Sequence, residues 1–129
     1  FESALSSNLI IAERGTKMGL PEVLFNLFPG MGAYSLLSRK IGAVAAEKMI
    51  LSGKLYTAEE MFEVGVVDIL AEKGEGELAL HQYIKTASKS PNTYKAMAKV
   101  TTEDVASIVE MLGYFPALRR CSQRLFLFD

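Results

Sequence analysis

The chain has 129 residues, half of them hydrophobic, and a formal net charge of −1. This length suits about one domain with a sizeable core. The near-neutral charge gives no electrostatic case for binding nucleic acid or an acidic membrane surface. No uninterrupted apolar run approaches the roughly 18 residues of a membrane-spanning helix, so no membrane span is expected.

Cys121 is the only cysteine and His81 the only histidine. A single thiol excludes an internal disulfide and favours a reducing compartment, which predicts a cytoplasmic protein. No cysteine, histidine or aspartate cluster accompanies His81. A metal site and a cysteine–histidine catalytic pair are therefore both disfavoured, and no metal is predicted.

The first part of the chain predicts two extended segments joined by a turn. Residues 8–13, with the sequence NLIIAE, form a short apolar run rich in β-branched residues, which is typical of a buried strand. A turn is expected at 14–16, and 17–19 can form a short extended piece. Pro21 then suits the first position of a helix, and the apolar turn that follows ends at 29–30.

The rest of the chain predicts mostly helix. Helices are expected at 33–42 and 43–53, and each closes on a glycine. Thr57 and Glu60 form a capping-box pattern that starts another helix, and 66–70 is a second strand candidate. Further helices are expected at 77–89, from 91 to about 99, and from Thr102 onward. So few strands cannot make an independent sheet, so we expect the chain to be part of a longer protein.

Gly30 and Gly32 form a G-x-G pattern between two apolar helical segments. The pattern lacks the later glycine of a dinucleotide-binding loop and does not follow a strand. A helix-breaking turn is the ordinary explanation. No bound cofactor is predicted.

Glu2 and Glu22 stand apart from the other acidic residues, most of which occupy polar helical positions. If the strand at 8–12 runs away from Glu2 and the turn reverses the chain, Glu22 returns to the vicinity of Glu2. Two carboxylates in one apolar pocket have their pKa values pushed apart, so that one can act as an acid and the other as a base. Surface glutamates or charges at helix starts are the alternative explanation.

The ordered motifs resemble the second half of the crotonase (enoyl-CoA hydratase/isomerase) superfamily. The matching pieces are Glu2, GLPE at 19–22, PGMG at 29–32, the LSG-to-TAEE stretch at 51–60 and GVVD at 65–68. This resemblance implies an α/β fold that is the C-terminal part of a ββα spiral, mostly helical with two or three short strands. Residues 1–72 would carry the core with both glutamates. Residues 73–129 would be a helical region that covers the site and builds an oligomer, of trimer type.

Within the superfamily, FNLFPGMGAYSLLSRKIG at 25–42 looks most like diffusible signal factor synthases, which make cis-2-unsaturated fatty-acid signals. The resemblance implies dehydration of a 3-hydroxyacyl thioester on acyl carrier protein, followed by thioester hydrolysis. Glu2 and Glu22 would be the acid–base pair, and Gly30 would offer a backbone N–H near them. A turn glycine is an equally good explanation of Gly30.

The same resemblance places Leu27, Phe28 and Met31 beside a long acyl chain. Core packing is the alternative for all three, and it is the favoured interpretation of Phe28. Phe126, Leu127 and Phe128 depart from the branch's usual final helix and are interpreted as a candidate oligomer contact.

Two other functions stay open. One is an ordinary CoA-dependent enoyl-CoA hydratase or isomerase, and the other is a non-catalytic crotonase-like interaction module. In the family, two backbone N–H groups that precede the first glutamate stabilise the enolate, and losing one such donor costs roughly 3 kcal/mol or more. These 129 residues alone are therefore expected to be inactive.

Overall fold

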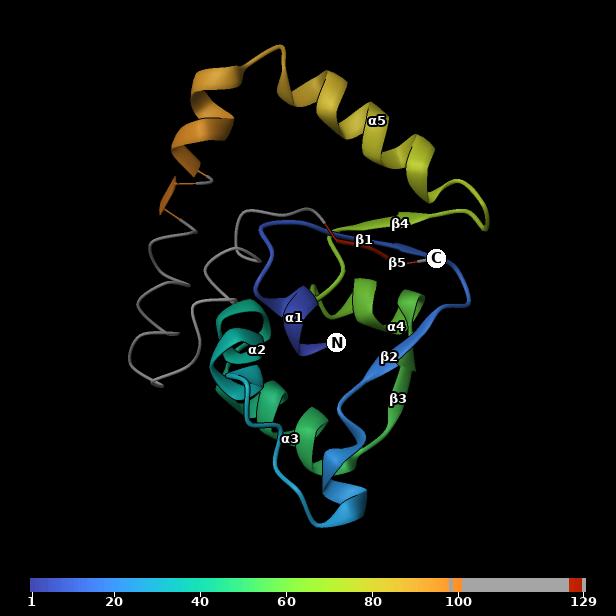
Figure 1. Cartoon of the computed structure of the whole chain (residues 1–129), viewed down its shortest axis with the longest axis vertical. Helices are drawn as coiled ribbons and strands as arrows, with labels where there is room; N and C mark the ends of the chain where they lie inside the picture. Colours follow the sequence, from blue (N-terminus) through green and yellow to red (C-terminus); the bar gives the residue numbers. More distant parts are fainter. Residues whose placement is uncertain (98, 101–125, 129) are drawn as a thin grey trace.

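The computed structural model describes residues 1–97, 99–100 and 126–128 (Figure 1). In order, the elements are α1 (Glu2–Leu5), β1 (Ile10–Glu13), β2 (Lys17–Gly19), the 3₁₀ helix η1 (Pro21–Phe25), α2 (Ala33–Ile41), α3 (Ala43–Ser52), β3 (Leu55–Thr57), α4 (Ala58–Glu63), β4 (Ile69–Ala71), α5 (Gly76–Ala87) and β5 (Phe126–Phe128). Residues 91–97 are also helical. The helix predicted from Thr102 and the thiol of Cys121 lie outside the described residues.

The main sheet has the strand order β4-β1-β5, and both neighbours run parallel to β1. Ile11 lies opposite Ile69 on one side and opposite Leu127 on the other. Residues Phe126–Phe128 form strand β5 at the edge of this sheet, and their role as an oligomer contact stays a prediction. The predicted strands at 8–13 and 66–70 correspond to β1 and β4 with shifted ends.

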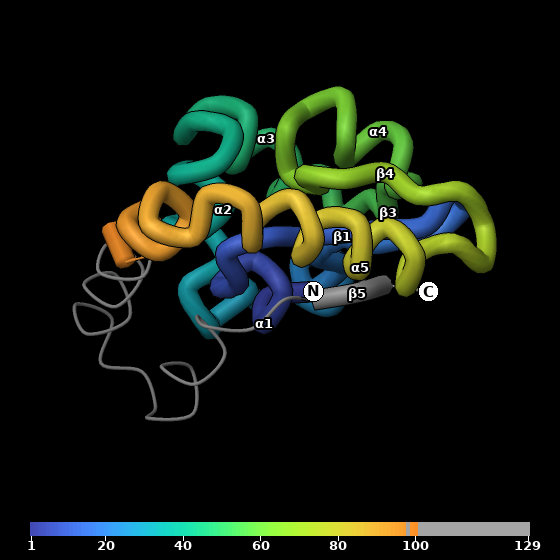
Figure 2. Tube along the Cα trace, turned by 90° about the horizontal axis from the view of Figure 1, so that it is seen from above, coloured from blue at the N-terminus to red at the C-terminus, as the bar shows by residue number. Residues whose placement is uncertain are grey.

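Both faces of this sheet are covered by helices. Side chains along a strand point alternately to opposite faces. Ile10 and Ala12 accordingly join the main core, whereas Leu9 and Ile11 join a smaller cluster with Leu80 and Tyr83 of α5. Helix α5 crosses above the sheet, while α1 and α4 lie below it (Figure 1), and α5 passes in front of β1 when the molecule is seen from above (Figure 2). Burial on both faces explains why β1 is a continuous apolar run.

The second sheet pairs β2 with β3 in antiparallel fashion, and Gly19 lies opposite Leu55. Strand β3 was not predicted, since its three residues show no recognisable pattern. The turn after Pro21 is a 3₁₀ helix rather than an α-helix, and it ends at Asn26 in the left-handed conformation with φ 57°.

Glycines and one capping box set the ends of the central helices. Helix α2 ends at Gly42 and α3 at Gly53, as predicted. The Thr57 side chain accepts from the N–H of Glu60, and the Glu60 carboxylate accepts from the N–H of Thr57, so the predicted capping box is confirmed. The helices pack around one main core whose buried members include Leu5, Leu20, Leu36, Leu37, Ile50, Met61 and Val66.

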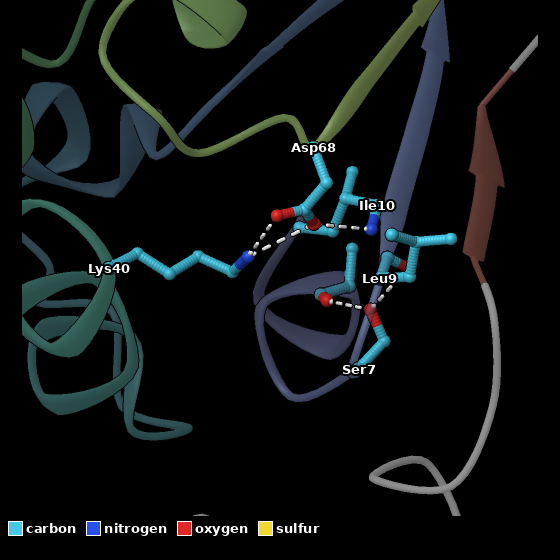
Figure 3. A network of polar contacts seen from close by, with 6 residues as sticks. Ser7, Leu9, Ile10, Lys40 and Asp68 are labelled. Atoms are coloured by element: carbon cyan, nitrogen blue, oxygen red, sulfur yellow. Dashed lines mark hydrogen bonds and ion pairs between the residues drawn. The ribbon is translucent and has the colours of Figure 1, made fainter. Parts of the chain in front are cut away.

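A polar network anchors the start of β1 (Figure 3). The Asp68 carboxylate accepts from the N–H of Ile10 at 2.8 Å and from Lys40 Nζ at 3.2 Å. The N–H of Asp68 in turn donates to the carbonyl of Ile10 at 2.9 Å. Because Lys40 belongs to α2, this network joins that helix to the sheet.

Candidate active site

Glu2 begins α1, and the buried side chains of Ala4 and Leu5 fix this short helix to the core. Its Oε1 accepts a hydrogen bond from the N–H of Met31 at 3.2 Å. Gly32, which precedes α2 with φ 87°, has no side chain to cap that helix. The carboxylate of Glu2 therefore lies where the start of α2 offers unpaired N–H groups.

Glu22 lies in the first turn of η1, directly after Pro21. The residue is partly exposed, yet its Oε2 is buried and has no hydrogen-bond partner in the described part of the chain. A buried carboxylate oxygen without a donor is energetically costly. Such an atom is therefore available to a proton or a donor brought by a ligand.

The pKa of Glu2 is raised above its ordinary value. Burial is the largest cause, and the negative charge of Glu22 acts in the same direction, while the N–H of Met31 opposes them. Glu22 is thus close enough to Glu2 for their charges to interact. A carboxyl group with a raised pKa next to a second carboxyl group is an arrangement typical of acid–base pairs.

The residues named from sequence as acyl-chain neighbours lie on the surface of the loop between η1 and α2. The exposed fractions are 63% for Leu27, 67% for Phe28 and 41% for Met31. The favoured core-packing interpretation of Phe28 is therefore wrong. Phe28 instead lines an open cavity of about 400 Å³ with Tyr34, Glu47, Ile50 and Leu51.

The backbone N–H that reaches Glu2 belongs to Met31, the neighbour of Gly30. Gly30 itself is exposed in the same loop. Sequence reasoning found the PGMG turn but could not tell which of its N–H groups points to the carboxylate. That choice depends on the positive φ of Gly32, which turns the chain into α2.

Two glycines that the sequence predicts as ordinary helix or strand ends make close contacts with neighbouring segments, one with residues 54–55 and the other with Val23 and Leu24. They are Gly19 and Gly53, and neither position has room for a side chain.

Within the described residues, no group of three or more histidine, cysteine, aspartate or glutamate side chains could hold a metal ion. The described helices include none with the length and apolarity needed to cross a bilayer.

The sequence profile of the enoyl-CoA hydratase/isomerase family matches residues 1–112. The chain belongs to this family. It is 34% identical over 96 residues to 2,3-dehydroadipyl-CoA hydratase of Escherichia coli, covering 74% of this chain and 38% of that protein. It is also 34% identical over 102 residues to the peroxisomal bifunctional enzyme of Danio rerio, covering 79% of this chain and 14% of that enzyme.

Solved structures bear out the predicted crotonase-type α/β fold. An enoyl-CoA hydratase from Geobacillus kaustophilus superposes with a TM-score of 0.65 at 26% identity, covering 93% of this chain and 44% of that one. DspI from Pseudomonas aeruginosa superposes with a TM-score of 0.63 at 32% identity, covering 80% of this chain and 37% of that one. The chain thus spans less than half the length of each of these relatives.

Proposed function

We propose that the chain carries the acid–base residues of an enoyl-CoA hydratase, which adds or removes water between the second and third carbons of an acyl thioester. The observation that carries the proposal is the buried, unpartnered Oε2 of Glu22 beside a Glu2 whose pKa is raised. The names of the relatives support coenzyme A as the carrier, because the Escherichia coli protein is a CoA hydratase.

In this proposal Glu22 acts as the general base and Glu2 as the general acid. In the dehydration direction, Glu22 accepts the proton from the second carbon through its free oxygen. The bond between the third carbon and its hydroxyl then breaks, and Glu2 supplies the proton that lets this group leave as water. A raised pKa suits Glu2 for this role, because it favours the protonated form that a general acid needs.

Proton removal leaves a negative charge on the thioester oxygen, and two backbone N–H donors have to stabilise it. We place these donors in sequence that precedes Glu2 in the complete catalytic unit. The 129 residues alone are accordingly predicted to show no turnover. The division into a core at 1–72 and a covering, oligomer-forming region at 73–129 is part of the same proposal, as are a trimer-type assembly and a cytoplasmic location.

A second candidate is a signal factor synthase that dehydrates a long 3-hydroxyacyl chain on acyl carrier protein and then hydrolyses the thioester. The exposed apolar loop supports it, since Leu27, Phe28 and Met31 are exposed, the N–H of Met31 donates to Glu2, and Phe28 lines an open cavity. A long aliphatic chain could cover these side chains. A non-catalytic interaction module is the third candidate, and it predicts that replacing either glutamate changes no turnover.

The test measures hydration of 2-enoyl thioesters by the protein at its full natural length, with CoA and acyl carrier protein as alternative carriers. Glu2→Gln and Glu22→Gln should each reduce kcat by at least about 10²-fold, as expected for the loss of a general acid or base. Glu63→Gln is the control, because Glu63 is an exposed glutamate on α4. Full activity of Glu22→Gln would reject the proposal. Faster release of free acid from the acyl-carrier-protein substrate would favour the second candidate.

A further inference from the structure

Gly19 comes shortly before the turn that carries Glu22 in the sequence, and Gly53 packs against the two residues that follow Glu22. Gly19 ends β2 and pairs with Leu55 of β3. Gly53 is buried at the end of α3 in the left-handed conformation, with φ 59°. Lys54 is the single residue between Gly53 and β3, so both contacts are made by one short segment, residues 53–55.

At Gly19 the obstacle to a side chain is backbone. A Cβ atom there would lie 2.6 Å from the carbonyl oxygen of Lys54 and 3.2 Å from the Cα of Leu55. Since neither backbone atom can rotate away, β2 and β3 would have to separate. Gly19 is not among the residues with positive φ, so an alanine at this position changes the contact and adds no φ strain.

At Gly53 the obstacle is η1 itself. A Cβ atom there would lie 2.8 Å from Cγ1 of Val23 and 2.9 Å from Cγ of Leu24. These two residues directly follow Glu22 in the 3₁₀ helix. The absence of a side chain at Gly53 therefore leaves room for the side chains of Val23 and Leu24 against the end of α3.

We infer that Gly19 and Gly53 are positioning residues for Glu22: they set where η1, and with it the Glu22 carboxyl group, lies relative to Glu2. Glu2 is fixed from another direction, by the N–H of Met31, so a shift of η1 changes the separation of the two carboxyl groups. This inference rests on the proposed function. A misplacement of about 1 Å at a reacting group can lower the rate about 10²-fold.

The test compares Gly19→Ala and Gly53→Ala with Gly65→Ala in the protein at its full natural length. Gly65 also follows a helix with positive φ, at 86°, but its Cβ would meet nothing within 4 Å. It therefore controls for backbone strain. We expect kcat to fall about 10²-fold in both test variants with little change in KM, and kcat to stay within about twofold in the control.

Two further measurements separate positioning from general destabilisation. Adding Val23→Ala and Leu24→Ala to the Gly53→Ala variant removes the obstructing atoms and should restore most of kcat. An NMR titration should show the pKa of Glu2 lower in Gly19→Ala and Gly53→Ala than in the parent, because Glu22 has moved away. If Gly53→Ala does not fold, Gly19→Ala provides the same test without φ strain.

The outcomes distinguish the inference from the function on which it rests. Full turnover by Glu22→Gln would overturn the proposed function. If Glu22→Gln loses turnover while Gly19→Ala and Gly53→Ala behave like Gly65→Ala, the proposed function stands and the positioning role is rejected.

Discussion

Replacing Asp68 tests which of its two contacts, with the N–H of Ile10 or with Lys40, contributes more to stability. The Asp68 carboxylate accepts from the N–H of Ile10 at 2.8 Å and from Lys40 Nζ at 3.2 Å (Figure 3). The exposed side-chain fractions are 12% for Lys40 and 32% for Asp68. Asp68→Ala removes both contacts, Asp68→Asn keeps an oxygen for the N–H but no charge, and Lys40→Met removes only the ammonium group.

The expected losses in unfolding free energy follow from how deeply each contact of Asp68 is buried. Ile10 is fully buried, so its unpaired N–H costs about 1–3 kcal/mol in Asp68→Ala. Asp68 is about one-third exposed, so we count its ion pair with exposed pairs, which are worth about 0–1 kcal/mol. We therefore expect losses in unfolding free energy of about 3 kcal/mol for Asp68→Ala and about 1 kcal/mol for Asp68→Asn. Lys40→Met should cost less than about 1 kcal/mol, because its apolar stem stays in place.

The assay is equilibrium unfolding in urea, followed by circular dichroism. Glu72→Ala serves as the control, since it removes the exposed ion pair with Arg14, and it should change stability by less than about 1 kcal/mol. A loss in Lys40→Met as large as that in Asp68→Ala would refute the reasoning, because it would assign the stability to the ion pair instead of to the strand N–H.

Substitutions at three other positions test local contacts. Thr57→Ala should cost about 1 kcal/mol of unfolding free energy, since it removes one side of the capping box, and Thr57→Ser should restore most of it. The N–H groups of Gly74 and Gly76 hold the pKa of Glu13 below 4.5. The ionised carboxylate of Glu13 therefore stabilises the start of α5 above that pH, and this stabilisation is lost as the pH falls. Hydrogen exchange of α5 should be faster in Glu13→Gln than in the parent at pH 7, and the two proteins should exchange at the same rate in acid. The pKa of Glu2 is raised, so its effect on stability has the opposite pH dependence: the parent loses stability as the pH rises above 4.5. Glu2→Gln should therefore become more stable relative to the parent over this range. A stability difference between the two proteins that stays constant with pH would contradict this.

The sequence predicted the features that are encoded locally. The glycines after α2 and α3 end those helices because the chain needs positive φ there. The Thr57–Glu60 capping box depends on two residues three positions apart, so the pattern alone was sufficient. The two extended segments before Pro21 were also predicted, because their residue pattern is local as well.

Features that depend on distant partners were missed or misassigned. Strand β3 exists because it pairs with β2, and β5 because it pairs with β1, and neither pairing can be read from three residues. Phe28 is hydrophobic enough for a core, yet the loop that carries it leaves it exposed. The steric roles of Gly19 and Gly53 are visible only once α3, β3 and η1 are packed together.

The pKa of Glu2, measured by NMR in the parent chain and in Glu22→Gln, tests the central claim most directly. That claim is that the two carboxyl groups share one partly buried site. We predict a pKa above 4.5 in the parent, and a lower value in Glu22→Gln, with burial keeping part of the elevation. Glu63→Gln should leave the pKa of Glu2 unchanged. A pKa of Glu2 at its ordinary value that does not move in Glu22→Gln would contradict the shared site.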